Sequence, residues 1–224
     1  MDLLSDDPAR RAHCLDTVAR AYWKPVYKYV RLRWSADVDR AEELTQSFFA
    51  TAIDREMLAG YEPGRARFRT FLRACLDRHV IDEHRRSQAK RRGGARLQLE
   101  FSEAESELAT ASRADDPHDQ FEAEWLRHIM HLAVERLETH LADAGKPIHA
   151  DLFRDYHLRD DPPSYAEAAA RYQISVSNVT NWLHATRREF RRAALEVLAE
   201  LTLDEADFAA EALAVFGIDV HARP

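Results

Sequence analysis

Apolar residues recur every three or four positions along most of the chain, the spacing that places side chains on one face of an α-helix. The N-terminal pattern predicts a helix over 8–34, which Pro25 is expected to bend or divide. A second helix is predicted over 39–57 and a third from about Ala66 to Arg86. Glycine and β-branched residues are sparse in these segments. The expected fold class is therefore all-α.

The pattern divides the chain into two small helical domains joined by an acidic flexible linker. The first domain is expected over 1–90 and the second over 119–200, followed by a short helical extension at 201–224. Residues 91–118 are polar, glycine-broken and then acidic, so they bury too little apolar surface to offset the entropy of ordering. Within this linker, 99–108 has the pattern of a short helix.

The second domain contains two short helical patterns on either side of the tripeptide "QIS". Ser164 can cap the first of them, and Glu167 three residues later completes a capping box. Ser175 or Ser177 can cap the second. This arrangement predicts a helix-turn-helix, whose second helix would enter the major groove of DNA, although an ordinary helical hairpin has the same pattern. The helices expected in this domain and its extension are 119–143, 149–157, 165–172, 176–200 and 204–216.

Charge is distributed unevenly along the chain, whose formal net charge is −7. Residues 65–92 hold ten basic and three acidic residues, whereas 97–124 hold nine acidic residues and one basic residue. A basic block followed by an acidic one indicates a nucleic-acid-binding face beside a different element. The alternative is two solvated helix faces.

Several classes of protein are not expected. No apolar run approaches the roughly 18–20 residues of a membrane span, and the N-terminus lacks the layout of a signal peptide, so no membrane partner and a cytoplasmic location are expected. Cys14 and Cys75 are far apart in sequence and are expected to be reduced. A zinc site would need the histidines to converge with thiols or carboxylates, and their spacing alone does not predict one, so no metal site is expected. With no glycine-rich phosphate loop or nucleophile elbow, neither an enzyme nor a cofactor is expected.

Three segments together resemble a bacterial RNA polymerase sigma factor of the extracytoplasmic-function (ECF) type, which has only regions 2 and 4. They are "RAEELTQSFF" (40–49), "YEPGRARFRTFLRACLDRHVIDEHRR" (61–86) and "SYAEAAARYQISVSNVTNWLHATRREFRR" (164–192). The resemblance covers about 10–200 and implies that the partners are core RNA polymerase, through its β′ and β subunits, and promoter DNA. The C-terminal tail also resembles a subgroup that is linked to Ser/Thr protein kinases.

The resemblance assigns roles in region 2. The positions that would bind polymerase are Arg40, Glu42, Glu43, Gln46 and Ser47. Arg40 and Ser47 replace acids of the family motif, which makes this face less acidic. Phosphorylation of Ser47 or of Thr51, one turn further on, would restore negative charge. Control by an anti-sigma protein is the alternative.

Region 2 would also recognise and open the −10 element. Cations for phosphates and rings for an unstacked base suit that task. The candidate residues are Tyr61, Arg67, Phe68, Arg69, Arg73, Arg78, Arg85 and Arg86. The alternative for Phe68 and Phe71 is packing in the helical core, because they lie on the inward stripe.

Region 4 would place its second helix on the −35 element. Candidates for reading bases are Ser177, Asn178, Thr180, Asn181 and His184, and those for phosphates are Arg187, Arg188, Arg191 and Arg192. Two positions depart from the family pattern. Gln173 stands where the turn usually has glycine, and Trp182 stands where a basic residue is common.

The most favoured function is an alternative sigma factor. A stand-alone helix-turn-helix regulator that never binds polymerase is the main alternative. A protein-interaction module that has lost DNA binding is a third, for which Arg40 and Trp182 give slight support.

Overall fold

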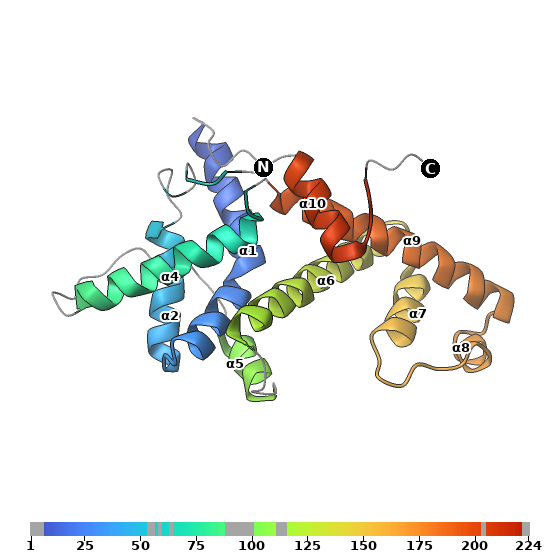
Figure 1. Cartoon of the computed structure of the whole chain (residues 1–224). Helices are drawn as coiled ribbons and strands as arrows, with labels where there is room; N and C mark the ends of the chain where they lie inside the picture. The colour runs from blue at the N-terminus through green and yellow to red at the C-terminus, as the bar shows by residue number, and fades with distance from the viewer. Residues whose placement is uncertain are drawn as a thin grey trace. The chain divides into compact units, whose positions relative to one another are not determined.

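The computed structural model of the chain describes residues 7–52, 57, 60–62, 65–87, 101–110, 116–202 and 205–220 (Figure 1). All regular secondary structure within these ranges is helical, which confirms the predicted all-α class.

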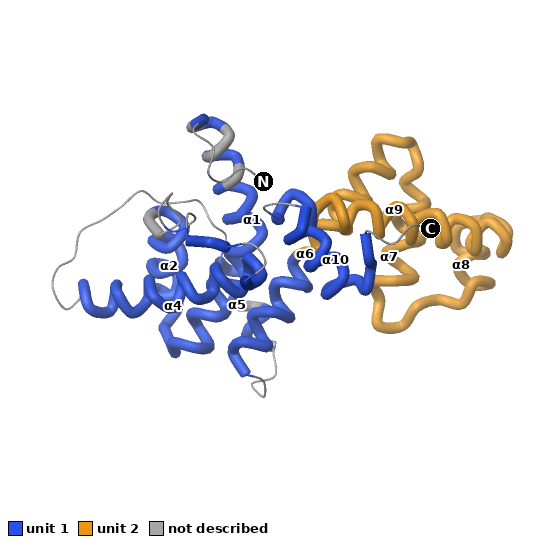
Figure 2. Tube along the Cα trace, turned by 45° about the horizontal axis from the view of Figure 1, so that its top comes forward, with its two compact units in different colours: residues 1–128, 198–224 blue, residues 129–197 orange. Residues whose placement is uncertain are grey.

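The helices form two compact units, which Figure 2 shows in different colours. Unit 1 comprises Met1–His128 and Leu198–Pro224, and unit 2 comprises Ile129–Val197. The expected boundary near residue 119 is displaced, because the first turns of helix α6 (Pro117–Asp143) bury Phe121 and Trp125 within unit 1. The C-terminal extension likewise belongs to unit 1.

Helix α1 (Pro8–Arg33) begins where Asp7 accepts a hydrogen bond from the Ala9 amide at 2.9 Å. Pro25 lies inside α1 and does not divide it, contrary to one of the predicted outcomes. An internal proline costs about 3 kcal/mol. Burial of most side chains between 18 and 30 offsets this cost, since α1 packs against α2 and α5.

Helix α2 (Val38–Ser47) continues into a π-helical turn, η1 (Phe48–Ala52). Asp37 caps α2 by accepting from the Arg40 amide at 2.8 Å. Phe48 and Phe49 are both buried, and the wider π turn lets adjacent rings share the inner side. The single helix predicted over 39–57 is therefore modified at its end, and residues 53–56 lie outside the described ranges. Helix α4 (Phe68–Ser87) follows.

Part of the predicted flexible linker is folded. Helix α5 (Phe101–Thr110) packs against α1, with the Phe101 ring 4.9 Å from that of Tyr27 and with Ala104 fully buried. Its carboxylates meet basic residues of α1: Glu105 lies 2.5 Å from the Arg31 Nε. These ion pairs stabilise the docking of α5 together with its small apolar stripe. The short helical pattern at 99–108 predicts the helix, but the composition does not show that α1 would pair with it. Residues 88–100 and 111–115 lie outside the described part.

Unit 2 contains the end of α6, then α7 (Pro147–His157), α8 (Tyr165–Tyr172) and most of α9 (Val176–Leu201). A core cluster joins α7, α8 and α9 through Leu152, Ala168, Ala169, Val179 and Leu183. The small side chains of α8 allow α9 to cross it closely. Helix α10 (Glu205–Phe216) is the last element and belongs to unit 1.

Candidate functional site

The junction of α8 and α9 is fixed by local hydrogen bonds. The Ser164 Oγ accepts from the Glu167 amide at 3.2 Å, and the Glu167 carboxylate accepts from the Ser164 amide at 2.8 Å. This is the predicted capping box. At the start of α9 the Oγ of Ser175 accepts from the Asn178 amide at 3.0 Å, so Ser175, and not Ser177, is the cap.

The turn between these helices is left-handed at Gln173. Its φ of 54° and ψ of 43° end α8, and the Ile174 amide donates to the Ala169 carbonyl at 3.0 Å. A residue with a Cβ pays about 1–2 kcal/mol for this conformation, which explains why glycine is usual here. The structure therefore accommodates the departure that the sequence suggested, with some backbone strain.

A hydrogen-bonded carboxylate joins α7 to α8. Asp155 accepts from the Tyr172 hydroxyl at 2.9 Å and also from Arg171 and Arg159. Although burial raises the pKa of Asp155, these donors outweigh it and hold the pKa below its usual value. The ionised carboxylate thus stabilises the arrangement of the helix pair.

One side of α9 is buried and the other is exposed. Val179, Leu183 and Thr186 face the core of unit 2. The exposed residues include Ser177, Asn178, Thr180, Asn181, His184, Arg187, Arg188 and Arg191. Trp182 is half-buried and stacks on His149, with ring centroids 4.3 Å apart. Trp182 therefore packs on a residue of α7.

Arg187 is held in place by α7. Its Nε donates to His157 Nε2 at 3.0 Å, and its guanidinium lies 5.6 Å from the centre of the Tyr156 ring. Burial, together with the charge of Arg187, lowers the pKa of His157, so this imidazole is neutral and can accept. Arg187 remains exposed while its orientation is restricted.

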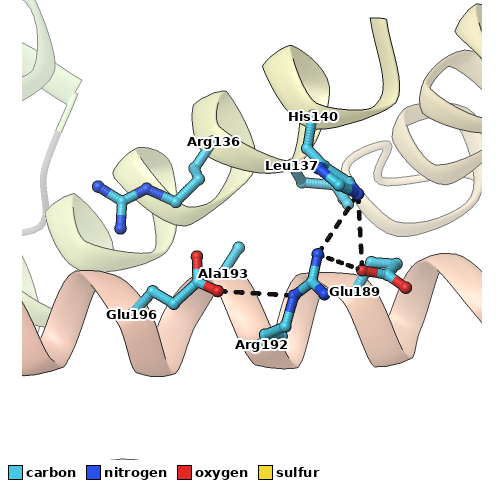
Figure 3. Close-up of a pocket in the computed structure, with 7 residues that line it drawn as sticks. All are labelled: Arg136, Leu137, His140, Glu189, Arg192, Ala193 and Glu196. Carbon is cyan, nitrogen blue, oxygen red and sulfur yellow. Dashed lines mark hydrogen bonds and ion pairs between the residues drawn. The ribbon is translucent and has the colours of Figure 1, made fainter. Parts of the chain in front are cut away.

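Arg192 differs from the other arginines of α9. Figure 3 shows it in a small pocket, where it lies 2.8 Å from Glu189 and 3.5 Å from Glu196. His140 of α6 lies 3.3 Å from the same guanidinium. Two carboxylates compete for this cation, so the expected phosphate contact by Arg192 has less support from the geometry than that by Arg187.

The C-terminal half of α4 is exposed and basic. The side chains of Arg85 and Arg86 are 77% and 70% exposed, and each has an acidic neighbour three residues earlier in the helix. Such surface ion pairs contribute about 0–1 kcal/mol, so a phosphate can displace them. Arg67, ahead of α4, and Arg78 are also exposed.

Three of the residues expected at the −10 element are buried. Tyr61, Phe68 and Arg69 are 8%, 1% and 5% exposed. The Phe68 ring packs edge-on against Tyr61 at 5.4 Å, which agrees with the alternative of core packing. The Tyr61 hydroxyl donates to Asp207 of α10 at 3.1 Å.

Arg69 occupies an acidic and aromatic site. Its Nε lies 2.5 Å from Glu122 of α6, its NH1 lies 2.6 Å from Glu211 of α10, and its guanidinium lies 4.3 Å from the Trp125 ring centre. Arg73 also approaches Glu122, at 3.5 Å. In this structure neither Arg69 nor Tyr61 is available to DNA, because residues from two distant helices cover them.

The face of α2 expected to bind polymerase is mixed. Glu43 is exposed and pairs with Arg40 at 2.7 Å, while Glu42 and Gln46 are half-buried. Thr51, the second expected phosphorylation position, has a side chain outside the described part.

Ser47 is one of the positions assigned to polymerase binding, but its hydroxyl is turned toward α4. The Ser47 Oγ donates to the Leu44 carbonyl at 3.1 Å and lies 2.8 Å from His79 Nε2. His79 is 8% exposed, and burial lowers its pKa, so it is neutral at pH 7.

Sequence reasoning missed the acidic partners of region 2. The hydrophobic pattern does not single out Glu122, but Asp207 and Glu211 stand one turn apart in a segment that, apart from Glu205, is alanine-rich and apolar. Paired carboxylates on the apolar face of a helix are a signal for buried cations, and this signal was available.

Neither a cluster of metal ligands nor a membrane-spanning helix occurs among the described residues. No group of three or more His, Cys, Asp or Glu side chains there is placed to hold a metal ion. None of the helices described is both long and apolar enough to cross a membrane.

Comparison with known proteins identifies the family. The model of the family described as "ECF sigma factor" matches residues 33–196. No curated protein and no solved structure matches the chain. The matched segment includes α2, α4 and the α8–α9 pair, whose geometry is described above. Because the match spans well over half of the sequence, the chain belongs to the ECF sigma factor family.

Proposed function

We propose that this protein is an alternative sigma factor that directs core RNA polymerase to specific promoters and initiates transcription there. Membership of the family supports the general role. The exposed polar and basic side of α9, which follows a capped turn, is the observation that carries the proposal. A helix with such a face is suited to the major groove.

Unit 2 is proposed to bind the −35 element. Asn178, Asn181 and His184 offer donors and acceptors to base edges from the first turns of α9. Arg187 and Arg188 lie further along the helix, where they would contact phosphates. The hydrogen bond to His157 orients Arg187 before DNA arrives, so less side-chain entropy is lost on binding.

Unit 1 is proposed to bind polymerase and the −10 element. Glu43 and its neighbours on α2 form the polymerase-binding surface, and the exposed arginines of α4 face DNA. The exposed set at the −10 element is Arg67, Arg78, Arg85 and Arg86. Partners other than polymerase and DNA, namely a Ser/Thr kinase or an anti-sigma protein, are proposed from the resemblance alone.

Activation by phosphorylation has little support at Ser47. Its hydroxyl is already bonded to Leu44 and lies against the buried His79. A phosphate there would require this contact to open and a doubly charged group to be placed beside a buried ring. An anti-sigma partner or an element of the chain itself is the simpler source of control.

The proposal is tested by run-off transcription with purified core polymerase on a promoter library. We expect the full chain to select promoters that core polymerase alone ignores. Arg187→Ala combined with Arg188→Ala should weaken all promoters alike and flatten the salt dependence, whereas Asn181→Ala should relax selectivity at the −35 element.

Lys146→Ala is the control, because Lys146 is an exposed cation of unit 2 that lies outside α8 and α9. It should change neither property. DNA binding without any response to core polymerase would instead favour the stand-alone regulator. Absence of DNA binding by the full chain, with and without core polymerase, would favour the interaction module.

A further inference from the structure

Helix α10 buries two carboxylates. Its sequence is dominated by alanine and other apolar residues, yet Asp207 and Glu211 are only 6% and 3% exposed. Aspartate and glutamate are almost never this buried unless they are paired. These two side chains therefore have a partner surface that requires charge.

That partner surface is the part of region 2 expected to meet the −10 element. Tyr61 donates to Asp207 at 3.1 Å, and Arg69 pairs with Glu211 at 2.6 Å. A guanidinium offers the same fork of donors to a carboxylate as to a phosphate. Asp207 and Glu211 thus occupy positions in which DNA groups would find complementary partners.

We propose that α10 is an autoinhibitory helix, which covers Tyr61 and Arg69 and withdraws when promoter DNA binds. This inference rests on the proposed function, since it assumes that region 2 binds DNA. The proposal reconciles the expected roles of Tyr61 and Arg69 with their burial. The two residues are buried while α10 is bound, and they contact DNA once α10 has withdrawn.

The contact has the properties of a reversible one. Burial raises the pKa of Glu211 to about 6, and the opposing charges of Arg69 and Arg67 do not compensate for it. Asp207 and Glu122 add repulsion. An isolated helix as short as the 12 residues of α10 is marginal in water. The contacts with Tyr61 and Arg69 are therefore weakened by the cost of burying Glu211, and DNA can compete with α10 for this surface.

The experiment uses the full chain with Glu211→Arg, which places a cation beside Arg69 and should release α10. Binding of labelled mixed-sequence single-stranded DNA is followed by fluorescence anisotropy, and hydrogen exchange is followed in α10. We expect at least tenfold tighter binding and faster exchange of the α10 amides. Glu205→Arg is the control, because Glu205 is exposed on the same helix and the change in net charge is the same.

Equal tightening by Glu211→Arg and Glu205→Arg would mean that only net charge matters and would overturn the proposal. Faster exchange in α10 without tighter binding than the control would overturn it as well. If Glu211→Arg does not fold, Asp207→Ala removes the acceptor of the Tyr61 hydroxyl and should tighten binding at least twofold.

The two proposals fail differently. If Glu211→Arg binds DNA more tightly than Glu205→Arg but neither variant nor the wild type supports run-off transcription, the sigma activity fails and the autoinhibitory helix stands. If transcription occurs and the affinities are equal, the autoinhibitory helix fails alone.

Discussion

Replacing Arg69 by methionine tests whether this residue stabilises the fold in the state in which α10 covers it, as distinct from contacting DNA. Arg69→Met removes the shared cation between Glu122 and Glu211 and keeps most of the apolar stem. Arg67→Met is the matched control, because Arg67 is exposed and lies two positions earlier.

The magnitude follows from the burial of each partner. Breaking a buried ion pair by removing one member costs about 3–5 kcal/mol. The Glu122 side chain is 35% exposed and can regain water, and Glu211 already has a pKa of about 6, so it can take up a proton. Both effects place the cost near the lower limit, about 3 kcal/mol, including the lost contact with Trp125.

The assay is thermal unfolding followed by circular dichroism at pH 7, with near-ultraviolet signal from the aromatic residues of unit 1. For a unit of this size, each kcal/mol shifts Tm by about 2–4 °C, so Arg69→Met should lower Tm by about 6–12 °C. Arg67→Met should leave Tm unchanged and weaken DNA binding. An unchanged Tm in Arg69→Met would refute the buried site described for this arginine.

Three further changes are informative. Gln173→Gly relieves the left-handed strain at a smaller entropic cost, so the stability of unit 2 should rise by about 0.5–1 kcal/mol in a denaturant titration; a fall would mean that the Gln173 side chain contributes more than its backbone strain costs. Asp155→Asn should destabilise unit 2 at pH 7. Because the pKa of Asp155 is lowered in the folded state, the stability difference between the aspartate and the asparagine protein should disappear as the pH falls below about 4, which melting curves across pH would detect. Ser47→Glu places a charge against buried His79, so it should lower Tm and not raise affinity for core polymerase, whereas tighter binding would restore phosphorylation of Ser47 as a mechanism.

Most of the helices were predictable to within a few residues because their ends depend on local chemistry, whereas the end of α2 was not. Ser164 with Glu167 begins α8, and Asp37 begins α2. These caps involve residues three positions apart, which a sequence displays directly. The exposed face of α9 was predictable for the same reason, since periodicity separates its buried and exposed sides.

The buried state of the −10 residues was not predictable from periodicity. Arg69 and Glu211 are 142 positions apart, and nothing local indicates that they pair. Helix α5 was underestimated in a related way, because its stability depends on charges of α1 that meet Glu105 and Glu107 only in the folded chain. The composition of a segment describes only that segment, whereas these contacts depend on the residues against which it packs in the folded chain.

The docking of α5 on α1 also governs the chemical reactivity of two amines. Lys24 and Lys28 are 8% and 2% exposed and are ion-paired with Glu107, whereas Lys146 is exposed. Acylating reagents modify the accessible, neutral form of an amine, so Lys146 should react quickly and the two α1 lysines should be protected. Departure of α5 from α1 would remove the Glu107 partner of Lys24, whereas Lys28 would keep its ion pair with Glu124 of α6 at 2.6 Å. The acylation of Lys24 relative to Lys146 would therefore report, without any introduced label, whether the segment between regions 2 and 4 is bound or free.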